Sequence, residues 1–276
     1  MSDTGRIVDH YATDDIAGRV VAALRKALGP DARPTPDALA PIDHFHGGSL
    51  PATKELVALL KPARGERLLD LGSGIGGPAR WIASTYDCHV TGIDLTAAFC
   101  RAAEALNALT GMTERVRIVE GSALDLPFEP ASFDRAYSQN VVMNIADKPR
   151  FYREALRVLK PGGVLALSNL AAGPNGPPYY PVPWAHTANE SFLSTPEATR
   201  RELAQAGFEI VHFEDTTART VPERRAQREK VEREGLPPLG PHVFMGERMR
   251  EFSINTSRGA EEGRLASLEI LVRKPA

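Results

Sequence analysis

A glycine-rich stretch follows an acidic residue at the end of an apolar run, in the segment LLDLGSGIGG. Gly72, Gly74 and Gly77 match the pattern G-x-G-x-x-G, and Asp94 follows 17 residues after the last of them. Glycines at such positions permit a tight turn and let a ligand approach the backbone closely. The pattern therefore predicts a site for an adenosine-containing ligand. By itself it does not separate a dinucleotide from another adenosine ligand, and a strand-to-helix turn without any ligand is the alternative.

Asp70 lies at the entrance to this loop, and its charge helps to choose between the ligand classes. A carboxylate there would repel a pyrophosphate, but it suits a ligand that carries an ammonium and a sulfonium group. A long segment with its own helical pattern precedes the loop, and no second dinucleotide-binding half follows the fifth predicted strand. We therefore expect a cationic amino-acid nucleoside rather than NAD.

The rest of the chain offers few groups for acid–base or metal chemistry. No catalytic triad, carboxylate pair or metal-ligand cluster is visible, so no metal site is expected. His46, His186 and His242 are the candidates for a general base, and each has the alternative of a loop or surface histidine. Cys88 and Cys100 are the two cysteines, and they lack the spacing of a metal or redox pair.

Short apolar runs alternate with helical patterns through the middle of the chain, which is typical of parallel strands joined by helices. Strands are predicted over 67–71, 88–93, 115–120, 133–137 and 163–169, and helices over 76–85, 96–110 and 147–158. The segment LKPGG is predicted to be a turn. After it, the pattern predicts a helix over 196–206 and strands over 208–215 and 265–272. The glycine loop would then follow the first strand of an α/β sheet.

Two parts of the chain lie outside this alternation. Residues 1–64 contain an amphipathic helical pattern at 14–28, a Pro-rich linker at 30–41 and a helix that opens near Ala52, and we expect this segment to act as a lid. The 48 residues of 216–263 far exceed a usual hairpin connection and predict a cap over the substrate. A solvated helix pair packed on one edge is the alternative. The charged run PERRAQREKVEREG within this segment indicates a salt-bridged surface.

Composition limits the partners of this protein. The 276 residues carry a formal net charge of −2, so there is no overall positive field to hold nucleic acid or an anionic membrane. No apolar run approaches the roughly 20 residues that span a bilayer, and the first residues lack the apolar core of a signal peptide. We expect a cytoplasmic protein, a monomer or a homodimer, with a small-molecule partner.

Five segments, LLDLGSGIGG, VTGIDL, GSALDLPF, SFDRAYSQNVV and RVLKPGG, stand in the order and spacing of the class I S-adenosylmethionine-dependent methyltransferases. Over residues 65–170 the chain closely resembles the small-molecule branch of that family. The resemblance implies S-adenosylmethionine as methyl donor and S-adenosylhomocysteine as product. It also implies a Rossmann-like α/β fold, in which helices cover both faces of a seven-stranded sheet of order 3-2-1-4-5-7-6 with strand seven antiparallel. Residues 65–276 would form this core, with small helical cap elements at 171–193 and 216–263.

The resemblance assigns cofactor contacts to particular residues. Asp70, Gly72 and Gly74 would hold the methionine part of the cofactor. Asp94 would accept hydrogen bonds from both ribose hydroxyls, because a carboxylate has two oxygens, and Leu95 would pack on the adenine. At the adenine amino group the family often has an acid where this chain has a serine, so a hydroxyl or the nearby backbone would make that contact. The whole predicted cofactor set is Asp70, Gly72, Ser73, Gly74, Asp94, Leu95, Ser122, Ala123, Leu124, Ser138 and Gln139.

The methyl acceptor would bind beside the segment that follows the fourth strand, against apolar and aromatic walls from 171–193 and 216–263. The predicted acceptor residues are Asn140, Tyr179, Tyr180, Trp184, His242, Phe244 and Met245. The predicted catalytic residues are His186, Gln139 and His46. Methyl transfer is an in-line displacement that depends on alignment and water exclusion, and a general base is optional.

The predicted function is therefore S-adenosylmethionine-dependent methyl transfer to a small-molecule acceptor. The sequence leaves open whether nitrogen, oxygen, sulfur or carbon receives the methyl group. One alternative is a module that binds the cofactor without turnover. An NAD-dependent oxidoreductase is another.

Overall fold

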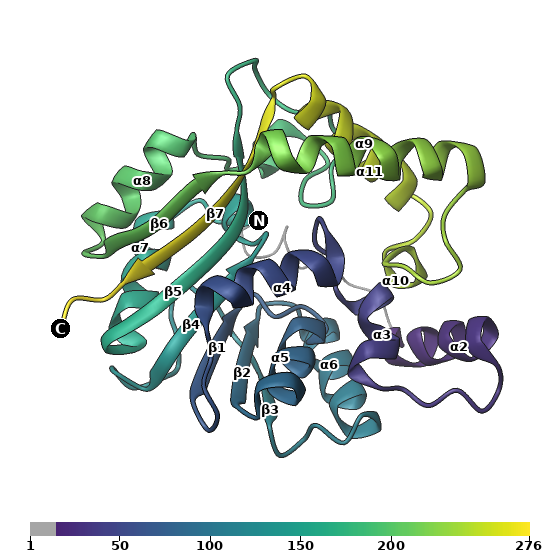
Figure 1. Cartoon of the computed structure of the whole chain (residues 1–276), viewed down its shortest axis with the longest axis horizontal. Helices are drawn as coiled ribbons and strands as arrows, with labels where there is room; N and C mark the ends of the chain where they lie inside the picture. Colours follow the sequence, from purple (N-terminus) through teal and green to yellow (C-terminus); the bar gives the residue numbers. More distant parts are fainter. Residues whose placement is uncertain (1–14) are drawn as a thin grey trace.

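The computed structural model describes residues 15–276, so the predicted lid is described only from its fifteenth residue onward. At its centre lies a seven-stranded sheet of order β3-β2-β1-β4-β5-β7-β6 (Figure 1). The strands are β1 (Arg67–Leu71), β2 (His89–Asp94), β3 (Val116–Glu120), β4 (Phe133–Gln139), β5 (Leu159–Ala172), β6 (Glu209–Asp215) and β7 (Leu265–Arg273). β7 pairs antiparallel with both β5 and β6, and the other neighbours pair in parallel. The predicted strand order and the antiparallel seventh strand are confirmed.

Helices cover both faces of the sheet because the central strands are apolar on both sides. The helices are α4 (Ser49–Leu60), α5 (Gly77–Tyr86) and α6 (Ala97–Leu109) on one face, and α7 (Lys148–Val158) and α8 (Pro196–Gln205) on the other. Along β5, Leu165 and Leu167 pack in the same cluster as α7 and α8, whereas Val164 and Ala166 pack with α4, α5 and α6. Successive side chains of a strand point to opposite faces, which produces this alternation. No helix among residues 15–276 is both long and apolar enough to cross a bilayer.

The lead-in before β1 consists of α2 (Ile16–Leu28), α3 (Pro36–Asp43) and α4. The expected Pro-rich linker is wrong over α3. The Thr35 side chain accepts a hydrogen bond from the Ala38 backbone N–H at 3.1 Å, and Pro36 occupies the first turn, where a proline fits a helix. Arg80 on α5 then fixes α3 to the core, because its Nη2 lies 2.9 Å from Oδ2 of the buried Asp43.

The predicted LKPGG turn lies inside β5. Leu159 pairs with Phe133, but the next pair in register is Val164 with Arg135. The residues between them on β5 therefore form a bulge, in which Gly162 has a positive φ of 75°.

The connection between β6 and β7 folds into three helices, α9 (Thr217–Glu234), α10 (His242–Met245) and α11 (Met249–Glu261). Figure 1 shows α9 and α11 side by side, with α10 reaching toward α2. Arg225 and Arg228 on α9 form ion pairs with Glu261 on α11, each at 3.1 Å, so the charged run does supply a salt-bridged surface. Phe244 on α10 packs in the same cluster as α2 and links this connection to the lead-in.

Candidate active site

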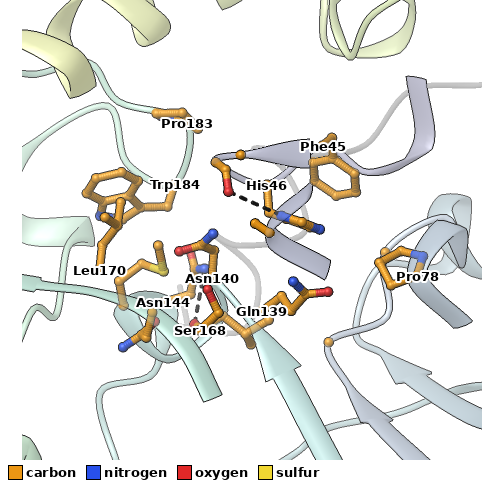
Figure 2. Close-up of a pocket in the computed structure, with 18 of the residues that line it drawn as sticks. Phe45, His46, Pro78, Gln139, Asn140, Asn144, Ser168, Leu170, Pro183 and Trp184 are labelled. Carbon is orange, nitrogen blue, oxygen red and sulfur yellow. Dashed lines mark hydrogen bonds between the residues drawn. The ribbon is translucent and has the colours of Figure 1, made fainter. Parts of the chain in front are cut away.

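A cavity of about 850 Å³ lies at the carboxyl ends of β1, β2 and β4. β1 has β2 on one side and β4 on the other, which makes this the switch point where open α/β sheets bind ligands. Figure 2 shows Phe45 and His46 of the lead-in, Gln139 and Asn140 at the end of β4, and Trp184 around a common space. The cavity has the size of a site for a small molecule together with a cofactor.

The loop after β1 needs glycine for backbone conformation and for space. Gly72 and Gly74 have φ angles of 83° and 53°, which cost other residues about 1–2 kcal/mol. A Cβ on Gly72 would lie 2.4 Å from Cγ2 of Val141, and one on Gly74 would lie 2.6 Å from Cε1 of Phe45. The loop is therefore packed tightly between the segment after β4 and the lead-in, while its remaining side faces the cavity.

Asp70 lines the cavity and is almost completely buried. Burial raises the pKa of its carboxyl to about 7, and the nearby charge of Asp94 acts in the same direction. The Tyr137 hydroxyl donates a hydrogen bond to Oδ2 at 3.0 Å, which partly opposes this rise in pKa. A cationic group of a ligand would favour the ionised carboxylate, so this position suits an ammonium.

Asp94, at the end of β2, is held by two backbone donors. Its Oδ2 accepts from the Gly74 N–H at 2.8 Å, and its Oδ1 accepts from the Thr96 N–H at 2.9 Å. Each carboxylate oxygen has a further lone pair, so the side chain can still accept from two neighbouring hydroxyls. Burial raises the pKa of this carboxyl as well, and Leu95 beside it lines the cavity.

A chain of hydrogen bonds joins the lead-in to the end of β4. Thr53 Oγ1 donates to Oε1 of Gln139 at 3.1 Å, and His46 Nε2 lies 3.1 Å from the same hydroxyl. With the Thr53 proton given to Gln139, His46 Nε2 donates the second bond and Nδ1 has a lone pair, 3.4 Å from the Gly47 carbonyl oxygen. Burial and the neighbouring His44 lower the pKa of His46 to about 3, so the ring is neutral near pH 7. Nε2 of Gln139 is buried without a partner among the described residues.

Comparison with known proteins assigns the chain to a family. A model of a methyltransferase domain matches residues 69–167. The chain is 30% identical over 202 residues to the sarcosine/dimethylglycine N-methyltransferase of Halorhodospira halochloris, covering 72% of this chain and 71% of that protein. The chain belongs to the small-molecule S-adenosylmethionine-dependent methyltransferases. The family sets aside the NAD-dependent oxidoreductase alternative.

Another similar protein, the glycine/sarcosine/dimethylglycine N-methyltransferase of Actinopolyspora halophila, is a longer chain. The present chain is 32% identical to it over 149 residues, which make up 54% of the present chain. The matched part is 26% of that relative, so the chain spans about a quarter of its length. Among solved structures, the [4+2]-cyclase SpnF has a TM-score of 0.71 and 23% identity, with 99% of this chain and 97% of that chain covered. At that identity the likeness shows the fold alone.

The cavity of the methyltransferase fits S-adenosylmethionine. All members of the predicted cofactor set except Ser138 line it. Ser73 Oγ is buried there without a partner among residues 15–276, as expected of a group that bonds to a ligand. Ser122 also lines the cavity, and its Oγ accepts from the Leu124 N–H at 3.1 Å. Ser138 instead donates to the Leu71 carbonyl at 2.7 Å and braces β4 against β1.

Three of the seven residues predicted to bind the acceptor line the cavity. Asn140, Trp184 and Met245 line it, and Trp184 is held by a hydrogen bond from Nε1 to Ser191 Oγ at 2.9 Å. Trp184 is also 5% exposed, so much of its indole packs into the protein rather than into the cavity. It can therefore shape the wall without being displaced by a ligand.

Phe244 lies outside the cavity, contrary to the expected wall position. Its ring makes edge contacts with Phe45 at 5.3 Å and Phe99 at 6.1 Å between centroids. α10 turns its apolar side toward α2, so Phe244 completes a core cluster beneath the lead-in. His242, at the start of the same helix, is likewise absent from the cavity wall.

The two predicted tyrosines also lie outside the cavity. Tyr179 is stacked between the guanidinium groups of Arg258 and Arg264, at 4.2 and 4.5 Å from its ring centroid. Tyr180 packs against the cluster that contains Trp184, behind the cavity wall. Both positions result from the path of the 173–193 loop, which passes over α11 before it returns to Trp184.

Of the three predicted catalytic residues, Gln139 and His46 line the cavity and His186 does not. The His186 ring lies 6.1 Å from the ring of Phe252 on α11. A catalytic residue must contact the substrate or the cofactor. His186 does not line the cavity, so the structure does not support the predicted catalytic role.

Sequence reasoning missed Phe45, Thr53 and Arg224. Phe45 covers Gly74, Thr53 completes the hydrogen-bond chain, and Arg224 lines the cavity. The sequence did contain a pattern that marks the position of Arg224. Helical spacing relates four residues that share the inward side of α9, namely Val221, Arg224, Arg228 and Val231.

Proposed function

We propose that this methyltransferase methylates the nitrogen of a small amine. The observation that carries this proposal is the hydrogen-bond chain of His46, Thr53 and Gln139, which holds a neutral imidazole and an unpartnered amide donor in the cavity wall. Bound S-adenosylmethionine would supply a sulfonium methyl group in line with the acceptor atom. The N-methyltransferases among the relatives support the same assignment.

The electrostatics of His46 favour an amine over a hydroxyl acceptor. A general base works best when its pKa is near the working pH, and a pKa of about 3 leaves His46 ineffective as a proton acceptor. A neutral amine already presents a lone pair and needs no proton removed before transfer. The acceptor nitrogen would form its bond to the methyl carbon as the bond from that carbon to the cofactor sulfur breaks, and a product ammonium that carries a proton would lose it to water after release. For a primary or secondary amine, His46 Nδ1 and the Gly47 carbonyl oxygen, 3.4 Å apart, would accept hydrogen bonds from the amine N–H and orient it.

The test combines an acceptor panel with a pH profile. Radiolabelled methyl transfer to sarcosine, dimethylglycine, small thiols and phenols would be followed, with mass spectrometry of any product. We expect amine products, and a kcat/KM that rises with pH until the amine is neutral. Methylation confined to phenols or thiols would contradict the proposal. Binding of S-adenosylhomocysteine without methylation of any acceptor would favour the silent binding module instead.

Thr53→Val tests the hydrogen-bond chain within the same assay. Valine keeps the shape of the buried side chain but removes the hydroxyl that joins His46 to Gln139. We expect kcat/KM for the amine to fall roughly tenfold, which corresponds to one lost hydrogen bond, while the affinity for S-adenosylhomocysteine changes little. Tyr179→Phe is the matched control, because it also removes one hydroxyl but lies outside the cavity.

A further inference from the structure

Arg224 is a cation in the cavity wall that has no acidic partner among residues 15–276. Its Nη2 donates to Ser267 Oγ at 3.4 Å, and its Nε is buried without a partner. Burial lowers the pKa of the guanidinium, and Glu223 is the one neighbouring charge that opposes this. Arginine nevertheless stays protonated in proteins, so the cavity contains a positive charge that lacks a fixed counter-ion.

In contrast to Arg224, Arg219 on the same helix has two acidic partners. Arg219 Nη1 lies 2.6 Å from Oε1 of Glu55, and its Nη2 lies 3.1 Å from Oε1 of Glu269. These carboxylates raise the pKa of Arg219, whereas the pKa of Arg224 is lowered. A desolvated charge without a partner is costly to keep, so Arg224 is suited to take its counter-ion from a ligand.

Ser267 supplies a second donor at the same place. Its Oγ accepts from Arg224 Nη2 and lies 3.2 Å from Thr220 Oγ1, whose single proton also has the Thr217 carbonyl as an acceptor at 3.4 Å. Rotation of the Ser267 hydroxyl can turn its proton toward an anion in the cavity, because Ser267 lines the wall. The guanidinium also lies against the lead-in, because a Cβ on Gly47 would be 3.0 Å from both Nη1 and Nη2.

We propose that Arg224 and Ser267 bind a carboxylate or phosphate group of the methyl acceptor. This inference rests on the proposed function, because it assumes that the acceptor occupies this cavity. A guanidinium presents a planar pair of donors that matches either anion. Gly47 is adjacent in sequence to His46, so the anion site lies close to the group that orients the amine. The acceptor is therefore a compact molecule that carries both an amine and an anionic group.

Binding of simple anions tests the site without requiring turnover. Inorganic phosphate and acetate would be titrated separately by calorimetry into the protein saturated with S-adenosylhomocysteine. We expect millimolar binding of at least one of them to the wild type, and the stronger of the two identifies the anion class. Arg224→Gln should weaken that binding roughly tenfold to hundredfold, the range for a lost charged hydrogen bond. Arg225→Gln is the matched control, since it removes the same charge from an exposed neighbour that pairs with Glu261.

Steady-state kinetics of methyl transfer provide a second test of the anion site. For sarcosine or phosphoethanolamine, Arg224→Gln should raise KM at least tenfold with a smaller change in kcat, whereas the KM of sarcosine amide should stay within about twofold. Absence of phosphate and acetate binding to the wild type, equal binding to the Arg224→Gln variant, or an equal rise in KM for the neutral amide would each overturn the proposal. If anion binding depends on Arg224 but no amine is methylated, the anion site stands and the proposed function fails. Unchanged S-adenosylhomocysteine affinity in both variants would show that the cofactor half is intact.

Discussion

The two halves of the cavity are built in different ways. The cofactor half comes from the ends of neighbouring strands, and its Asp94 is bonded to the backbone of the glycine loop at Gly74. The acceptor half brings together segments that are distant in sequence, as in the approach of Arg224 on α9 to Gly47 in the lead-in. Strand register fixes the first half, whereas the packing of surface helices fixes the second. Substitutions should therefore separate cofactor affinity from acceptor specificity.

The largest effect is expected in the glycine loop. Gly74→Ala places a Cβ 2.6 Å from Phe45 in a backbone conformation with positive φ. We expect S-adenosylhomocysteine affinity to fall by about a hundredfold or more, since strain and displacement of the loop combine. Gly65→Ala is the control, because Gly65 also has a positive φ, of 76°, but has nothing within 4 Å of the added Cβ. Equal losses in both variants would show that general destabilisation of the fold, and not the contact of the glycine loop with Phe45, is responsible.

Asp94→Ala is expected to have the next largest effect on the cofactor half. Loss of hydrogen bonds from ribose hydroxyls to a carboxylate corresponds to roughly 1.5–3 kcal/mol, or about ten- to hundredfold in dissociation constant. Calorimetry with S-adenosylhomocysteine measures it. The variant also loses the bonds to Gly74 and Thr96, so its melting temperature must be compared. A change in affinity below twofold would rule out the ribose contact.

Trp184→Ala addresses the acceptor half. Removal of the indole from the wall should lower kcat/KM for the acceptor by about tenfold or more, while cofactor affinity stays within about threefold. Because Trp184 is nearly buried, Trp184→Phe serves as a second variant that keeps an aromatic ring and loses the bond to Ser191. Equal loss of cofactor and acceptor affinity in a folded variant would contradict the separation of the two halves.

The smallest effect is the pH dependence of cofactor binding. With the pKa of Asp70 near 7, binding of an ammonium favours the ionised carboxylate and releases protons. Affinity is therefore full well above pH 7, falls about twofold at pH 7, and falls about tenfold at pH 6. Calorimetry in buffers of different ionisation enthalpy would detect the proton release. Asp70→Asn should flatten the profile, and a flat profile in the wild type would exclude an ammonium at Asp70.

The sequence by itself determined the sheet and most of the cofactor half. Alternating apolar runs located the strands, and the motifs at their ends named Asp70, Gly72, Gly74 and Asp94. This succeeds because strand ends of a parallel sheet converge on one edge, so residues next to them in sequence must lie near the ligand. A local pattern is then enough to predict which residues of the glycine loop and the strand ends line the cavity.

Only the tertiary structure decided the acceptor half. The pattern HVFM predicts an apolar helix side, but it does not say whether Phe244 faces the cavity or the cluster beneath α2. Likewise Arg224 and Arg225 are adjacent in one charged run, and the orientation of α9 alone places the first in the cavity wall and the second on the surface. Helical periodicity defines which residues share a side, whereas long-range packing decides what that side contacts.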